Sequence, residues 1–351
     1  MKLLLLGLIM LPTLLVASKT ATPGSRQWVL ENDQLRLTVQ GKGAIISDLH
    51  RKAGNENWLS PKQENSQGLY AHFLSFDRWG PVTRQERKLG IPFHGEAVRQ
   101  NWTATSSDPL AETLQVTLPV AKLQASRTVR LAALGSAFRI TTTVENPTSE
   151  TRPYNAVEHV TLSSIGYAEE TRVSTNATHG FVQMNGKLVP ESTFRWPVLT
   201  LREQTWNLRD WVRVQGMLIT SLIFDDNEPW GWACVENPTT GELLGYVWST
   251  QDYPWLMLWT HYKNGRVVNR ALEPGTTGLH RPLSELIQTA PMLDRPLVHY
   301  LNPGEQQTRR LWGFVLPRPA GASSSIKQVS VEEDAVIIAF DGNTETLRLP
   351  F

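Results

Sequence analysis

Hydrophobic and polar residues alternate along much of the chain. Leu35, Leu37 and Val39 are separated by single polar residues, and the same period of two recurs at Leu114–Val120 and Phe138–Val144. Such alternation is typical of strands that bury one face. Turn dipeptides punctuate the chain at Asn146-Pro147, Asn185-Gly186, Asn237-Pro238 and Asn264-Gly265. Many antiparallel strands without βαβ alternation predict an all-β sandwich.

Helical spacing is found mainly at Arg281–Ala290, where Pro282 stands near the first turn and Leu283, Leu286 and Ile287 follow. The spacing predicts one short helix there.

The C-terminal part has a different pattern. A stretch rich in Pro, Gly and Ser, Pro317–Ser325, precedes three short apolar runs at Ile326–Val331, Ala335–Phe340 and Thr344–Leu349. We expect a linker and a small β-meander over residues 317–351, after a sandwich domain over residues 19–316.

The N-terminus is typical of a targeting segment. Lys2 precedes an apolar run, Leu3–Val16, that is too short for an ordinary membrane-spanning helix. Val16 and Ser18 are small enough for the −3 and −1 positions of a signal-peptidase site. We therefore expect a signal peptide over residues 1–18 and a periplasmic or secreted protein without membrane attachment after cleavage. The alternative is an uncleaved N-terminal anchor.

Composition narrows the classes of function. The 351 residues include 34 Lys+Arg and 33 Asp+Glu, so the net charge of +1 argues against general nucleic-acid binding. Cys234 is the only cysteine, which excludes an intrachain disulfide and a multi-cysteine zinc site.

The 13 Trp residues could fill a wide sandwich core or stack on the C–H faces of sugar rings. Eight of them fall in one stretch: Trp196, Trp206, Trp211, Trp230, Trp232, Trp248, Trp255 and Trp259.

Three segments carry candidate chemistry, although the common nucleotide-binding, metalloprotease and serine-hydrolase motifs are missing. His94-Gly95 lies within Ile91–Ala97, Glu158-His159 lies within a strand-like run, and Glu273 precedes a Pro-Gly turn. Taken singly, each residue has a structural explanation. Their order and contexts together point to a known family.

The set resembles the aldose 1-epimerase (galactose mutarotase) superfamily over residues 27–316. The segment Pro92-x-His94-Gly95-x-Ala97 with Trp102 downstream is closest to the hexose-6-phosphate mutarotase branch, and Ala271–Pro274 is similar to the segment with the catalytic Glu. Tyr300–Glu305 is similar to a late strand of the family. The resemblance implies a large antiparallel β-supersandwich.

Two positions depart from the family pattern. Val98 separates Ala97 from Arg99, where the branch usually has an Arg directly after the Ala. Val160-Thr161 replaces the aromatic pair that usually follows the second His, so His159 is matched by position and strand context alone.

The resemblance implies roles for three residues in interconverting sugar anomers. Glu273 would take the proton of the anomeric hydroxyl, and His159 would give a proton to the ring oxygen. His94 would orient the substrate or serve as a second proton donor. Carboxylates with a reference pKa near 4.3 and imidazoles with one near 6.5 suit this chemistry, which needs no metal or organic cofactor.

Further residues are candidates for substrate binding. Asp77, Arg78 and Trp79 share a turn, and in the family an Arg upstream of the first His often contacts substrate. An Arg78–Asp77 pair could equally brace a loop. We expect the catalytic groups to line one open cleft, with at least one of Trp79, Trp255 and Trp259 facing it. The remaining candidates are Arg99, Asp252, Trp259 and His261.

Three functions fit these observations. The first is an exported sugar mutarotase, and the second is a carbohydrate-binding protein that has the pocket without turnover. The third is a lyase- or hydrolase-related sandwich. In each case the expected partner is a sugar or a sugar-derived ligand.

Overall fold

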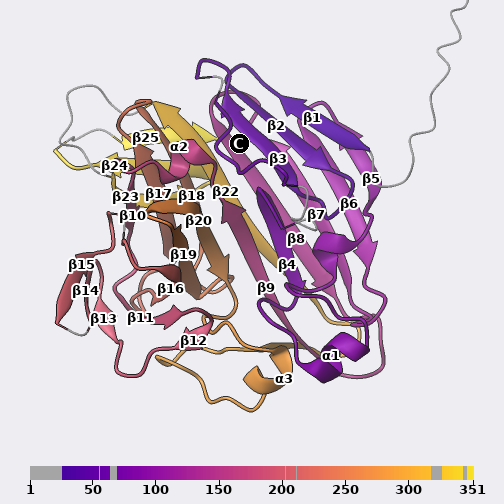
Figure 1. The fold of residues 1–351 in the computed structure, drawn as a ribbon. Helices are drawn as coiled ribbons and strands as arrows, with labels where there is room; N and C mark the ends of the chain where they lie inside the picture. Colours follow the sequence, from indigo (N-terminus) through magenta and orange to yellow (C-terminus); the bar gives the residue numbers. More distant parts are fainter. Residues whose placement is uncertain are drawn as a thin grey trace, which may run out of the picture.

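The computed structural model describes residues 26–54, 56–63, 69–201, 203–210, 212–317, 326–342 and 346–351. Almost all regular structure in these ranges is strand, arranged in three antiparallel sheets (Figure 1). The all-β prediction is therefore confirmed. The predicted signal peptide, most of the predicted linker and Trp211 lie outside the described residues.

The first sheet has 14 strands in the order β1-β2-β3-β4-β9-β20-β19-β16-β11-β13-β14-β15, with β12 beside β11 and β21 beside β9. Their bounds are β1 Gln27–Glu31, β2 Leu35–Gln40, β3 Ile46–Arg51, β4 His72–Asp77, β9 Arg152–Thr161, β11 His179–Met184, β12 Lys187–Leu188, β13 Phe194–Arg195, β14 Val198–Leu201, β15 Gln204–Asn207, β16 Gly216–Ile223, β19 Trp255–Lys263, β20 Arg266–Gly275 and β21 His299–Leu301.

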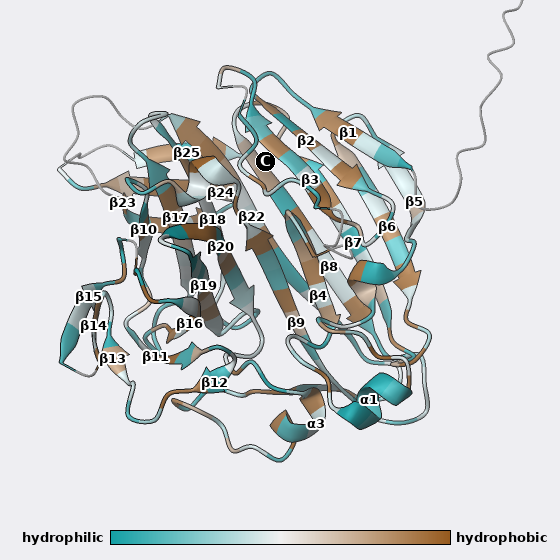
Figure 2. Ribbon diagram, in the orientation of Figure 1, coloured by the Kyte–Doolittle hydropathy of each residue, from teal (hydrophilic) through white to brown (hydrophobic). Residues whose placement is uncertain are grey.

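The second sheet has eight strands in the order β10-β17-β18-β22-β8-β7-β6-β5. Buried and less buried residues alternate in β8, as the sequence pattern predicts, and also in β7. The strands of this sheet carry both hydrophobic and hydrophilic residues (Figure 2). The bounds are β5 Thr103–Asp108, β6 Ala111–Thr117, β7 Gln124–Leu131, β8 Ala137–Glu145, β10 Arg172–Thr175, β17 Trp230–Asn237, β18 Glu242–Ser249 and β22 Gln306–Pro317.

The main core lies between these two sheets and contains a buried ionic network on β9. Arg127 of β7 donates two hydrogen bonds to the Glu158 carboxylate, at 2.7 and 2.8 Å, and His72 Nε2 lies 3.0 Å from it. Burial alone would raise the pKa of Glu158, but Arg127 and His72 lower it to about 2. This network fixes one face of β9, so His159, the next residue, points to the other face.

A third sheet covers the outer face of the second sheet. It contains β23 Ile326–Glu332, β24 Ala335–Phe340 and β25 Thr346–Pro350, which confirms the predicted β-meander. Val336, Ile338 and Phe340 belong to one buried cluster with Trp232 and Phe314 of the second sheet. Cys234 is buried in the same cluster, and burial raises the pKa of its thiol well above the usual value.

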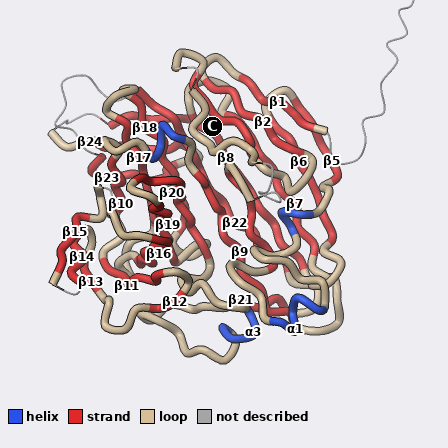
Figure 3. The backbone as a smooth tube through the Cα atoms, viewed as in Figure 1, coloured by secondary structure: helices blue, strands red, loops and turns tan. Residues whose placement is uncertain are grey.

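Helices are short: α1 Arg84–Lys88, α2 Ser164–Tyr167, α3 Leu283–Leu286 and the 3₁₀ turn η1 Ala97–Arg99. The predicted helix at 281–290 is only α3, because it begins after Pro282 and the chain meets Pro291 soon after Ile287. Helices α1 and α3 lie at the same end of the molecule (Figure 3). Among the described residues, no helix is long and apolar enough to cross a membrane.

Candidate active site

The register of the first sheet brings the predicted catalytic residues onto one face. Phe73 of β4 pairs with His159 of β9, and Met257 of β19 pairs with Glu273 of β20. Between them, β20 pairs with β9 through Leu272 and Val160. Because paired residues share a face and neighbours along a strand alternate, His159 and Glu273 both point away from the sandwich core.

His159 and Glu273 are in direct contact. His159 Nε2 lies 3.1 Å from Glu273 Oε1, and His159 Nδ1 lies 3.1 Å from Thr161 Oγ1. The Phe73 ring stacks on the imidazole at a centroid distance of 4.5 Å and fixes its plane. The second carboxylate oxygen of Glu273, Oε2, is buried and has no hydrogen-bonding partner among the described residues.

His94 approaches the same place from the loop between α1 and η1. Its φ is +63°, and Gly95 follows at +81°, where a Cβ would lie 2.5 Å from the Phe76 carbonyl oxygen. Only glycine fits this close approach of two backbones. The His94 and His159 rings are 5.6 Å apart between centroids.

The protonation of His94 follows from its hydrogen bonds. The Gly80 backbone N–H donates to His94 Nδ1 at 3.2 Å, so the neutral ring carries its proton on Nε2. Burial, assisted by the neighbouring His159, holds the pKa of His94 well below its usual value. His94 is therefore a neutral hydrogen-bond donor at neutral pH.

A third histidine, His280, completes the group and was missed by the sequence reasoning. Its ring lies 5.9 Å from that of His94 and 4.8 Å from that of Trp79. Burial lowers the pKa of His280 to about 4, although the Glu273 charge opposes this shift. His280 is in a loop without a motif, and its place shortly after the Glu273 strand was the only sequence signal.

Two aromatic side chains border the group. Trp259 is half-buried, with its ring 5.9 Å from His159, whereas Trp255 and Met257 on the same face are fully buried. The turn predicted at Asn264-Gly265 joins β19 and β20, in which Met257 pairs with Glu273 and Trp259 with Ala271. Phe93, which the sequence did not single out, is 37% exposed and lies 4.0 Å from the His94 ring between centroids.

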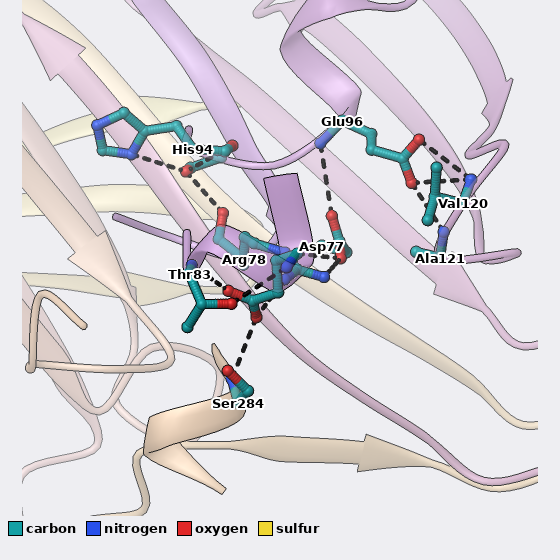
Figure 4. Close-up of polar contacts among 10 residues, drawn as sticks. Asp77, Arg78, Thr83, His94, Glu96, Val120, Ala121 and Ser284 are labelled. Carbon is teal, nitrogen blue, oxygen red and sulfur yellow. Dashed lines mark hydrogen bonds and ion pairs between the residues drawn. The ribbon is translucent and has the colours of Figure 1, made fainter. Parts of the chain in front are cut away.

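Asp77 and Arg78 form a brace rather than part of this group. Arg78 donates to Asp77 Oδ2 at 3.1 and 2.6 Å and to Glu86 Oε1 at 2.8 Å, and the Ser284 N–H donates to the same Glu86 oxygen (Figure 4). The brace thus joins α1 and α3. These internal bonds are the ones that the bracing alternative predicts, and contact of Asp77 and Arg78 with a substrate stays a prediction.

The other predicted binding residues differ in position. His261 stacks beside Trp259 at 6.4 Å, and the charge of Arg99 helps to lower the pKa of His94. Trp79 is buried between His94 and His280. Asp252 is separate, because it accepts a hydrogen bond from the Arg310 N–H on β22, and among the described residues none of its bonds reaches the histidines.

The site is more enclosed than the open cleft expected from the sequence. The exposed fractions of Glu273, His159 and His94 are 2%, 6% and 7%. The loops that carry His94 and His280 cover this face of the sheet. No group of three or more His, Cys, Asp or Glu residues in the described part of the chain could hold a metal ion.

Comparisons with known proteins agree at the level of the fold. No protein-family model matches the chain, and a search of curated proteins finds no relative. Among solved structures, a galactose mutarotase related enzyme from Lactobacillus acidophilus is 13% identical, with a TM-score of 0.62 over 84% of this chain and 99% of that one.

Two further structures are similar. A galactose mutarotase-like protein from Clostridium acetobutylicum is 14% identical, with a TM-score of 0.62 over 83% of this chain and 95% of that one. A GalM/aldose epimerase homologue from C. elegans is 13% identical, with a TM-score of 0.60 over 84% of this chain and 100% of that one. The narrower likeness to the hexose-6-phosphate branch stays a prediction. The chain has the galactose mutarotase-like β-sandwich fold.

Proposed function

We propose that the protein is a sugar mutarotase that interconverts the anomers of an aldose by general acid–base catalysis. The observation that carries the proposal is the Glu273–His159 pair, 3.1 Å apart, with His94 beside it on the same face. A carboxylate and an imidazole side by side can each reach one of the two oxygens bonded to the same acetal-like carbon and exchange protons with them.

Each residue has a role in this mechanism. Glu273 takes the proton of the anomeric hydroxyl through Oε2, which has no other partner among the described residues. As the C1–O5 bond breaks, His159 gives the ring oxygen its Nε2 proton, which in the free site faces Glu273 Oε1 at 3.1 Å. The open-chain aldehyde rotates about C1–C2 and the ring closes on the other face, with both protons returned. His94 donates Nε2–H to a substrate hydroxyl and fixes the orientation of the ring.

The enclosure of the site supports this chemistry. Buried charges interact more strongly than charges in water, because surrounding solvent no longer screens them. Trp259 and Phe93 provide apolar surfaces on which the C–H face of a sugar can pack. The site also contains the hydrogen-bonding groups that a polyol requires.

The direct test is anomer exchange followed by NMR. We expect the wild-type protein to accelerate exchange of at least one sugar in a panel of common hexoses, their 6-phosphates and uronic acids, compared with buffer alone. A wild-type protein that binds a sugar of this panel without accelerating exchange would instead be a carbohydrate-binding protein.

We also propose export, on the basis of the apolar run Leu3–Val16 and the small residues at Val16 and Ser18. N-terminal sequencing of the protein purified from its native compartment should begin at Lys19. A protein that retains Met1 and fractionates with membranes would indicate the uncleaved anchor.

A further inference from the structure

The backbone at His280 is fixed to the floor of the first sheet. The His280 N–H donates to Gln183 Oε1 at 2.9 Å, and Gln183 Nε2 donates to Ser221 Oγ and the Gly278 carbonyl at 3.0 and 3.1 Å. Gln183 and Ser221 are fully buried on β11 and β16. A loop held in this way places its side chain reproducibly beside Glu273.

The His280 ring packs tightly against the walls of the site. A Cβ on Gly80 would lie 2.8 Å from His280 Cδ2, so Gly80 permits the approach. The Trp79 and Phe93 rings meet the imidazole edge-on, at 4.8 and 5.8 Å. On the Nδ1 side lies Gly186, where an added Cβ would be 3.8 Å from that nitrogen.

Despite this packing, the ring has no polar partner in the part of the chain that the structure describes. Neither His280 nitrogen makes a hydrogen bond within the described residues, and Nδ1 is fully buried. Glu273 Oε2 and Trp79 Nε1 are also buried and have no hydrogen-bonding partner among the described residues. Buried polar atoms are nearly always paired, and His280 both contacts the Trp79 ring and lies within the field of the Glu273 charge, so these three atoms are positions for a hydrogen-bonding ligand. Two acceptors and one donor are complementary to hydroxyl groups, which both donate and accept.

We infer that His280 is a further substrate-binding residue, whose Nδ1 accepts a hydrogen bond from a hydroxyl of the sugar ring and so helps to select among sugars. The inference rests on the proposed function. The ring is neutral at neutral pH, as its low pKa requires, so Nδ1 is free to act as an acceptor when Nε2 carries the proton.

The test is a double-mutant-type cycle, in which one change removes the ring nitrogens of His280 and the other removes a single hydroxyl from the sugar. His280→Phe keeps a ring without polar atoms, and His280→Asn keeps a polar atom near the position of Nδ1. Exchange rates are measured for the preferred sugar and for its monodeoxy analogues. We expect His280→Phe to lower kcat/KM about 3- to 10-fold, mainly through KM, as for loss of one neutral hydrogen bond.

For one deoxy analogue, the kcat/KM of the wild type should fall by the same factor. With that analogue, His280→Phe should cause no further loss. His280→Asn should restore most of the activity. The inference would be overturned if the wild type exchanges anomers but His280→Phe causes no loss of kcat/KM. It would also be overturned if the losses from His280→Phe and from each deoxy analogue are additive. Both outcomes leave the proposed function intact.

His299 provides the matched control. It is also a histidine with a buried, unpartnered ring nitrogen, and burial lowers its pKa to about 4, but it lies on β21 beside Tyr154. His299→Phe should keep the exchange kinetics of the wild type. An equal loss in both variants would show an effect through the fold and overturn the inference.

If the wild type binds sugar without exchange, the proposed function fails and the same deoxy cycle is measured as Kd. If it binds no sugar at all, both the proposed function and the role of His280 are overturned.

Discussion

The side chains of the site are held by contacts that differ in kind from residue to residue. His159 is fixed by stacking on Phe73 and His94 by the Gly80 N–H, whereas the His280 ring is held by packing and has no polar partner among the described residues. The sequence indicated His94 and Glu273 through short motifs, and His159 through its position and strand context. It could not indicate His280, because the residues that surround this ring come from three distant segments.

Trp259 should contribute to sugar binding. Its half-buried ring beside His159 offers an apolar face to the sugar, whereas Trp255 is fully buried. We expect Trp259→Ala to weaken sugar binding about 3- to 10-fold, as for loss of one aromatic contact, in an NMR titration. Trp206→Ala, on β15, is the control. Unchanged affinity in a folded Trp259→Ala protein would remove this residue from the site.

The buried neutral histidines predict a pH dependence of stability. The pKa of His299 is about 4 in the folded protein and near its usual 6.5 when unfolded, so the unfolded state binds more protons between these values. The free energy of unfolding should therefore fall as the pH decreases from about 6.5 to 4. Over this pH range, the free energy of unfolding of His299→Phe should fall by about 3 kcal/mol less than that of the wild type, as measured by urea unfolding. Equal losses in the two proteins would contradict this account.

At the scale of elements, the hairpin β19–β20 was predictable, and the loops over the site were not. Asn264-Gly265 between two apolar runs indicates a hairpin locally. The loops depend instead on the contact of Glu86 in α1 with Ser284 in α3, which are 198 residues apart. No local sequence pattern reveals such a contact. The sequence around Arg78 therefore fitted a substrate-binding role and a bracing role equally well.

The brace can be tested by removing its cation. Arg78→Met leaves the buried Asp77 and Glu86 carboxylates without their partner, which should lower the free energy of unfolding by roughly 3–5 kcal/mol. Arg84→Met, at an exposed position of α1, should have little effect. Urea unfolding of both variants gives the comparison. Normal stability with weakened sugar binding in Arg78→Met would return Arg78 to the substrate site.

At the scale of the whole molecule, the third sheet completes the fold by covering an apolar outer face. The sequence predicted the meander but not its docking, because Trp232 and Phe314 look like residues of the main core when read along the chain. Apolar residues occur on both faces of β17 and of the second half of β22, and within the described residues the third sheet packs on the outer one. This arrangement also accounts for part of the high Trp content.

Phe340 tests this docking. It is buried between the third sheet and the second, so Phe340→Ala should lower the free energy of unfolding by about 3–5 kcal/mol. The more exposed Leu347 on β25 is the control, and Leu347→Ala should cost much less. Thermal unfolding followed by tryptophan fluorescence would measure both. Similar small losses in the two variants would mean that the third sheet is not firmly docked.

The central claim is that Glu273 acts as the base, and Glu273→Gln tests it most directly. The amide keeps the shape and the contact with His159 but cannot take the proton of the anomeric hydroxyl. Two-dimensional NMR exchange should show a turnover about 10²–10⁴ times lower than that of the wild type, with sugar binding nearly unchanged. The exposed Glu285→Gln on α3 should behave as the wild type. A Glu273→Gln protein that exchanges anomers at the wild-type rate would contradict the account.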